Sequence, residues 1–197
     1  RCQVVVDTSS SMLFPEEENI ANKLQFSCLG AASLITMLKK QLDAVGLSFF
    51  DDSLYLHTPC KSNTVHQKMM LTELEKKWNQ TIQNQGTNAA QILHQIADNI
   101  HKRSLVIVFS DMLDKVSDSA EIFDALQHLR YNKHEVILFH VQDSRYEVAF
   151  NFENRPYEFI DLETGNRLRM NSTQLKEAYV EKMSQYRNEL TLKCNQY

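Results

Sequence analysis

The chain contains only four cysteines, four glycines and three prolines among 197 residues. Its cysteines lie far apart, at positions 2, 28, 60 and 194, and form no Cys-x-x-Cys pair. We therefore expect reduced structural thiols rather than a disulfide framework. The glycines do not cluster either, which argues against the glycine-rich loop of a nucleotide-binding protein.

Long apolar runs and charge of one sign are also missing. The longest clean apolar run is Leu105–Phe109, which is far too short to cross a membrane. The net charge is −4 without long blocks of one sign, so no basic stripe predicts nucleic-acid binding. There is no signal peptide and no starting Met, and a strand pattern directly follows Arg1. We expect a cytoplasmic protein and a piece of a longer chain.

The apolar residues that are present alternate between strand-like and helical spacing. Strands are predicted at Cys2–Val6, Val45–Phe50, Leu54–His57, Leu105–Phe109 and Glu135–Val141. Helices are predicted at Ile20–Leu42, His66–Trp78, after Gly86-Thr87-Asn88 and at Ser117–Arg130. This order predicts an α/β fold, in which a doubly wound, mostly parallel central sheet of the Rossmann-like type carries helices on both faces.

The pattern changes after about residue 150. Glu158–Asp161 and Arg167–Met170 predict a β-hairpin that turns at Gly165-Asn166, and a last helix is predicted over Ser172–Leu190. No repeat or linker separates this part from the rest. We therefore expect a single domain over residues 1–197, with a core over 1–150 and a C-terminal hairpin and helix over 151–197.

Oxygen-bearing side chains follow the predicted strands. Asp7, Ser9 and Ser11 come after the first strand, Thr87 opens a helix, and Asp111 follows the Leu105–Phe109 strand. The carboxyl ends of parallel strands meet at one sheet edge, where α/β proteins bind ligands. Such oxygens suit Mg²⁺, Mn²⁺ or Ca²⁺. The competing interpretation is structural: these residues form turns, and Thr87 caps the next helix.

The motif Asp7-Thr-Ser9-Ser-Ser11, with Gly86-Thr87 and Phe109-Ser-Asp111, resembles the metal-ion-dependent adhesion site of von Willebrand factor A domains. The element order over residues 2–142 is similar to that fold. The resemblance implies Ser9, Ser11 and Thr87 as metal ligands, with Asp7 and Asp111 acting mostly through water. It also implies an open coordination position for a partner's acidic residue. The second loop departs from many relatives, which have two glycines where this chain has Gln85-Gly86.

The second half of the chain narrows this resemblance. Asp111-Met-Leu-Asp114, His134-Glu-Val-Ile, Asp143–Glu147 and Phe159–Gly165 resemble an uncharacterised prokaryotic branch of these domains. Members of that branch often accompany MoxR-type AAA+ ATPases. The resemblance implies a further segment before Arg1 and a final strand after Tyr197. Tyr146 and Glu147, which follow the fifth strand, are expected to border the metal face.

The sequence thus favours a metal-dependent protein–protein interaction module over an enzyme. The expected cofactor is a divalent cation, Mg²⁺ first and Mn²⁺ or Ca²⁺ as alternatives. The expected partner is a protein that supplies Asp or Glu to the metal, with a MoxR-type ATPase as the candidate. The alternative is a metal-dependent hydrolase on the same frame, although hydroxyls outnumber the carboxylates that usually activate water. In a third possibility the metal only stabilises a loop.

Overall fold

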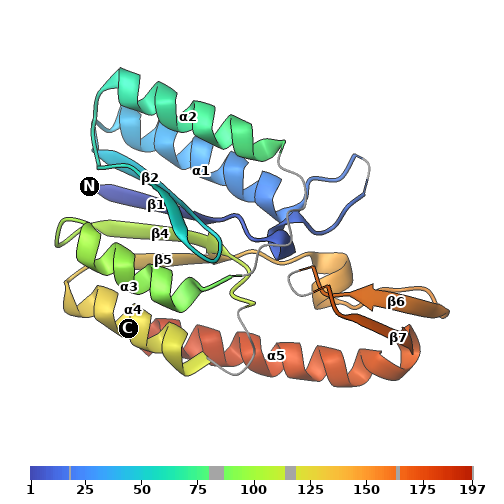
Figure 1. Ribbon diagram of the computed structural model, residues 1–197. Helices are drawn as coiled ribbons and strands as arrows, with labels where there is room; N and C mark the ends of the chain where they lie inside the picture. Colours follow the sequence, from blue (N-terminus) through green and yellow to red (C-terminus); the bar gives the residue numbers. More distant parts are fainter. Residues whose placement is uncertain (18, 80–86, 114–118, 163–164, 197) are drawn as a thin grey trace.

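The computed structural model describes residues 1–17, 19–79, 87–113, 119–162 and 165–196 (Figure 1). The central sheet consists of β1 (Cys2–Asp7), β2 (Val45–Phe50), β3 (Leu54–His57), β4 (Leu105–Ser110) and β5 (Glu135–His140). A separate hairpin pairs β6 (Pro156–Ile160) with β7 (Arg167–Asn171). The helices are α1 (Lys23–Lys40), α2 (Thr64–Trp78), α3 (Ala89–Asn99), α4 (Ser119–Tyr131) and α5 (Ser172–Gln196). Two short turns, η1 (Ser10–Leu13, a 3₁₀ helix) and η2 (Ser144–Val148, a π-helix), follow β1 and β5.

The five strands are arranged in the order β3-β2-β1-β4-β5. β1 pairs in parallel with both β2 and β4, β4 pairs in parallel with β5, and β3 is antiparallel. The predicted mostly parallel sheet is therefore confirmed. The chain runs outward from β1 to β2 and later from β4 to β5, so the order reverses between β1 and β4. Their carboxyl ends form the position at which open α/β sheets bind ligands.

Helices cover both faces of this sheet, as predicted. Side chains along β1 alternate between the faces, because successive residues of a strand point to opposite sides. Val4 and Val6 pack with α1 and α2, whereas Val5 packs with α3 and α4. Figure 1 shows α1 and α2 on one side of the sheet and α3, α4 and α5 on the other. All six residues of β1 are buried, because strands pair with both of its edges and helices pack on both of its faces.

The boundaries of α1 differ from the prediction. The helix begins at Lys23 rather than Ile20, because Asn22 and Gln25 form a capping box. The Asn22 side chain accepts from the backbone N–H of Gln25 at 2.8 Å, and the Gln25 side chain accepts from that of Asn22 at 3.2 Å. Apolar periodicity extended the predicted helix to Ile20 and Leu42, which both lie outside it.

The C-terminal hairpin and helix are present as predicted, and α5 continues to Gln196. The hairpin turns through Gly165 at φ +73°, while residues 163–164 lie outside the described part. Aromatic rings attach this part to the rest of the protein. The ring centres of Phe150 and Tyr179 of α5 are 4.7 Å apart, and those of Phe152 and Tyr146 of η2 are 4.9 Å apart. The hairpin thereby lies beside the carboxyl ends of the parallel strands (Figure 1).

Helix length and hydropathy give no candidate membrane span among the described helices. The four cysteines are free thiols, and Cys2 and Cys28 are buried. Burial raises the pKa of both thiols to about 12, with a further contribution from Cys60 at Cys2. A thiol with such a pKa forms little thiolate at neutral pH, and the thiolate is the reactive form.

We therefore expect Cys2 and Cys28 to resist alkylation by iodoacetamide at pH 8 in the folded protein. The partly exposed Cys60 and Cys194 should react first, and all four thiols should react in urea. Mass spectrometry of timed samples measures this order. Labelling of Cys2 or Cys28 before Cys194 in the folded protein would contradict the packing described here.

Candidate metal centre

Each of the four parallel strands is followed at its carboxyl end by an aspartate that closes a turn. In each turn one carboxylate oxygen accepts from the backbone N–H two residues on. The pairs are Asp7 with Ser9 at 2.9 Å, Asp51 with Ser53 at 3.1 Å, Asp111 with Leu113 at 3.1 Å, and Asp143 with Arg145 at 3.0 Å. The prediction that Asp7 and Asp111 form turns is thus correct for one oxygen of each carboxylate. The partner of the other oxygen differs from one aspartate to the next.

Asp7 and Asp111 are the two acids at the reversal point between β1 and β4, and both are fully buried. The second oxygen of Asp7 accepts from the Ser110 hydroxyl at 2.7 Å, and Ser110 in turn accepts from the backbone N–H of Met112 at 2.9 Å. Burial and the charge of Asp111 raise the pKa of Asp7 to about 7, against these hydrogen bonds. Two carboxyl groups in such a place favour a nearby positive charge.

The two serines of the motif face each other directly after β1. Ser9 and Ser11 place their hydroxyl oxygens 3.0 Å apart. The η1 turn that carries Ser11 is fixed by Met12 and Leu13, which are buried in the core with α1. The hydroxyl of Thr8, which directly precedes Ser9, donates to the Phe50 carbonyl at 2.8 Å and so fixes the loop to β2.

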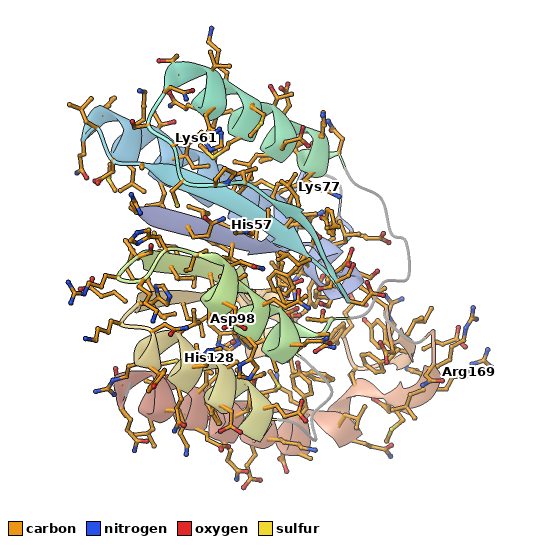
Figure 2. The ribbon with its side chains drawn as sticks, turned by 60° about the vertical axis from the view of Figure 1, so that its left-hand side comes forward. His57, Lys61, Lys77, Asp98, His128 and Arg169 are labelled. Atoms are coloured by element: carbon orange, nitrogen blue, oxygen red, sulfur yellow. The ribbon has the colours of Figure 1, made fainter. Side chains whose placement is uncertain are left out.

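Thr8 also lies 2.6 Å from the Tyr55 hydroxyl, which ties the loop to β3. The ammonium group of Lys77, labelled in Figure 2, lies 4.7 Å from the centre of the Tyr55 ring. Tyr55 therefore joins the end of α2 to the side of the loop opposite β4. Thr8 thus fixes the loop to β2 and β3, while Met12 and Leu13 fix it to the core. The hydroxyls of Ser9 and Ser11 face each other in this fixed loop.

Thr87 is buried immediately before α3. The N-cap of α3 is Asn88, whose side chain accepts from the backbone N–H of Gln91, so the capping role predicted as an alternative for Thr87 belongs to its neighbour. The backbone N–H of Asn88 donates to the carbonyl of Asp51 at 3.2 Å. This bond attaches the Thr87 segment to the same sheet edge, next to β2. Gly86 of the predicted motif lies outside the described residues, as does Asp114.

Sequence reasoning missed a buried lysine at this edge. Lys23, the first residue of α1, donates to the second oxygen of Asp111 at 2.8 Å and to Glu147 at 2.5 Å, and only 3% of its side chain is exposed. Burial lowers its pKa, but the two carboxylates outweigh this effect and raise it, so the ammonium stays charged. One signal was available: a cation in the first turn opposes the helix dipole and needs another reason to be there.

The residues predicted to border this face do so. Glu147 lies in η2 and reaches Lys23 with one oxygen, while its other oxygen accepts from the backbone N–H of Asp143 at 2.7 Å. The hydroxyl of Tyr146 donates to Glu17, in the loop between η1 and α1. These contacts join the loops after β1 and β5 across the end of β4.

Two residues from distant segments hold the backbone that carries Asp111. The Nε2 atom of His140 donates to the carbonyl of Asp111 at 2.9 Å, and the Tyr186 hydroxyl of α5 donates to the carbonyl of Met112 at 2.6 Å. Met112 has a φ of +50°, a conformation that few residues other than glycine adopt. Nothing in the motif itself could have indicated these two residues.

The chemistry of this edge fits a hard divalent cation. It offers two paired serine hydroxyls, a threonine and two buried carboxyl groups, which are the oxygen donors that Mg²⁺ and Mn²⁺ prefer. Within the described residues, no three His, Cys, Asp or Glu side chains come together to hold a metal. A centre here therefore depends on hydroxyl oxygens, which are poor ligands for zinc.

Replacing Ser110 with Ala tests how strongly Asp7 depends on its neighbour. The substitution removes a hydroxyl that serves both Asp7 and Met112, so we expect the free energy of unfolding to fall by about 1–3 kcal/mol. Urea denaturation measures the loss. Ser33→Ala is the control, since that exposed hydroxyl donates to the Leu29 carbonyl within α1 and its loss should change stability by less than about 0.5 kcal/mol. Equal effects at both positions would contradict the arrangement.

Solved structures share this fold at low sequence identity. BatB from Bacteroides thetaiotaomicron matches with a TM-score of 0.56 and 16% identity over 93% of this chain and 86% of that one. An aerotolerance-related membrane protein from Bacteroides fragilis matches with a TM-score of 0.53 and 17% identity over the same shares. Proximal thread matrix protein 1 from the mussel byssus matches at 0.52 and 16%, over 70% of this chain and 36% of its own. These likenesses show the fold alone.

No curated protein sequence matches this chain significantly. A family model does match, over residues 1–189, and its description is "Protein of unknown function DUF58". The match includes the whole sheet, the hairpin and most of α5, together with every residue of the candidate centre. The chain therefore belongs to the DUF58 family.

Proposed function

We propose that this sheet edge binds a divalent cation, Mg²⁺ first, and that a carboxylate of a partner protein completes its coordination. Ser9, Ser11 and Thr87 are the proposed direct ligands, and Asp7 and Asp111 act mostly through water. The observation that carries the proposal is the 3.0 Å pairing of the Ser9 and Ser11 hydroxyls beside two buried carboxyl groups at the reversal point of the sheet. The family and the fold are compatible with this function but do not define it.

The electronic character of the side chains explains why an acidic partner suits this edge. When bound, the cation supplies a Lewis-acid centre that accepts a carboxylate oxygen. Ser9, Ser11 and Thr87 contribute neutral oxygens, so they leave most of the positive charge uncompensated. Asp7 accepts from Ser110, and Asp111 is paired with Lys23. These contacts occupy both carboxylates, so they are proposed to reach the metal through water and not directly. An incoming Asp or Glu is then the strongest available ligand.

The same arrangement disfavours the hydrolase alternative. Metal-assisted hydrolysis usually places several carboxylates around the ion to activate water. Here the second oxygen of Asp111 already binds an ammonium group. We therefore propose a binding module and not an enzyme.

Three exposed arginines of η2 and the hairpin are each paired with a glutamate: Arg145 with Glu17, and Arg167 and Arg169 with Glu158. These glutamates compensate the arginine charges, so the bound metal is the proposed attraction for an acidic partner. Figure 2 shows Arg169 on the outer side of the hairpin, away from the central sheet. A MoxR-type AAA+ ATPase in the cytoplasm stays the candidate implied by the sequence resemblance.

Metal addition should stabilise the protein. At a concentration one hundred times its Kd, Mg²⁺ or Mn²⁺ contributes about 2.7 kcal/mol, which corresponds to a rise in Tm of about 5–10 °C for a chain of this size. Ser9→Ala and Thr87→Ala should abolish the rise, and the exposed Ser33→Ala should retain it. Differential scanning calorimetry measures these shifts. An unchanged Tm for the native protein in excess metal would rule out the centre.

Partner capture should need both the metal and the centre. We expect a pull-down from the source cell to retain a MoxR-type ATPase with Mg²⁺ present and to lose it with EDTA or with Asp7→Ala. Thermal melting of Asp7→Ala must first show a folded protein, because this buried side chain also closes a turn. Equal recovery of the ATPase under all three conditions would exclude a metal-bridged contact.

A further inference from the structure

The candidate centre contains a cation that belongs to the chain itself. The ammonium group of Lys23 is 2.8 Å from one oxygen of Asp111, which is proposed to act on the metal mostly through water. A lysine is an expensive residue to bury, and its position at the start of α1 places it against the positive end of the helix dipole. Its two carboxylate partners compensate for both effects.

Glu147 holds this lysine in place. Its Oε1 atom accepts from Lys23 at 2.5 Å, and its Oε2 atom accepts from the backbone N–H of Asp143 at 2.7 Å. Lys23 is thus fixed between a carboxylate that belongs to the centre and one that lies outside it. The pair Lys23 and Glu147 carries no net charge, but the positive member is the one in contact with Asp111.

We propose that Lys23 is a built-in competitor of the divalent cation, and that Glu147 limits the strength of this competition. The inference rests on the proposed function and concerns how that centre is regulated. The fixed ammonium group of Lys23, bound to Asp111, repels a divalent cation near the same carboxylate. Burial reduces the screening of this repulsion by water. The resting protein therefore binds metal weakly, and an added partner carboxylate offsets the repulsion.

The sign of the effect separates this role from a structural one. Lys23→Met removes one positive charge and keeps an unbranched side chain that is one atom shorter, so it should tighten metal binding. Glu147→Gln removes one negative charge and leaves Lys23 less compensated, so it should weaken binding. The double variant restores the charge balance and should return near the native affinity. A purely structural ion pair would lose function in the same direction in both single variants.

The test is a titration of each variant with Mn²⁺, in which electron paramagnetic resonance detects the free ion. We expect Lys23→Met to lower the Kd about tenfold or more, and Glu147→Gln to raise it by a similar factor. Lys40→Met, an exposed residue at the other end of α1, is the matched control and should not change the Kd. Circular dichroism confirms folding, and if Lys23→Met does not fold, Glu147→Gln and the double variant carry the comparison.

Each result has a clear meaning because Ser9→Ala marks loss of the centre. If Ser9→Ala abolishes Mn²⁺ binding but the charge variants leave the Kd unchanged, or shift it in the same direction, the competitor role of Lys23 is wrong and the proposed function stands. If the native protein, Lys23→Met and Ser9→Ala all fail to bind Mn²⁺, the proposed function is wrong as well. Opposite shifts for Lys23→Met and Glu147→Gln, with recovery in the double variant, support the inference.

Discussion

The parallel pairing of β1 with β4 is the constraint on which the rest of this edge depends. The register places Val6 opposite Phe109, so Asp7 comes next to Ser110 and Asp111 follows one residue later, with both carboxyl groups fully buried. Two acids so close together cannot both stay charged without compensation. The neighbouring residues provide it: Ser110 and the backbone of Ser9 donate to Asp7, while Lys23 donates to Asp111.

Turn formation and ligand binding are therefore compatible roles for the same residues. Asp7 and Asp111 each use one oxygen to close a turn, as Asp51 and Asp143 do after the neighbouring strands. What separates the central pair from the outer pair is the partner of the second oxygen. The site lies where the strand order reverses, so the fold brings together loops that are about 100 residues apart in the sequence.

The sequence predicted the elements well because apolar periodicity is set by local geometry. It located β2 and β3 to the residue, but it extended α1 to Ile20 because a capping box depends on two side-chain bonds that periodicity does not include. At the candidate centre the motif indicated Asp7, Ser9 and Ser11, which are close in sequence. Lys23, His140 and Tyr186 could not be found in this way, because they reach Asp111 and Met112 from α1, β5 and α5. Such contacts exist only after the sheet is assembled.

The family and the structural neighbours establish the architecture, and the chemistry of the edge carries the functional argument. The central claim is that a divalent cation binds through the hydroxyl oxygens of Ser9 and Ser11, which follow β1, and of Thr87, which precedes α3. A crystal structure of the protein grown with Mn²⁺, with anomalous scattering recorded at the manganese edge, tests this claim most directly. We predict an anomalous peak in contact with Ser9, Ser11 and Thr87. A map with saturating Mn²⁺ and no peak there would contradict the account.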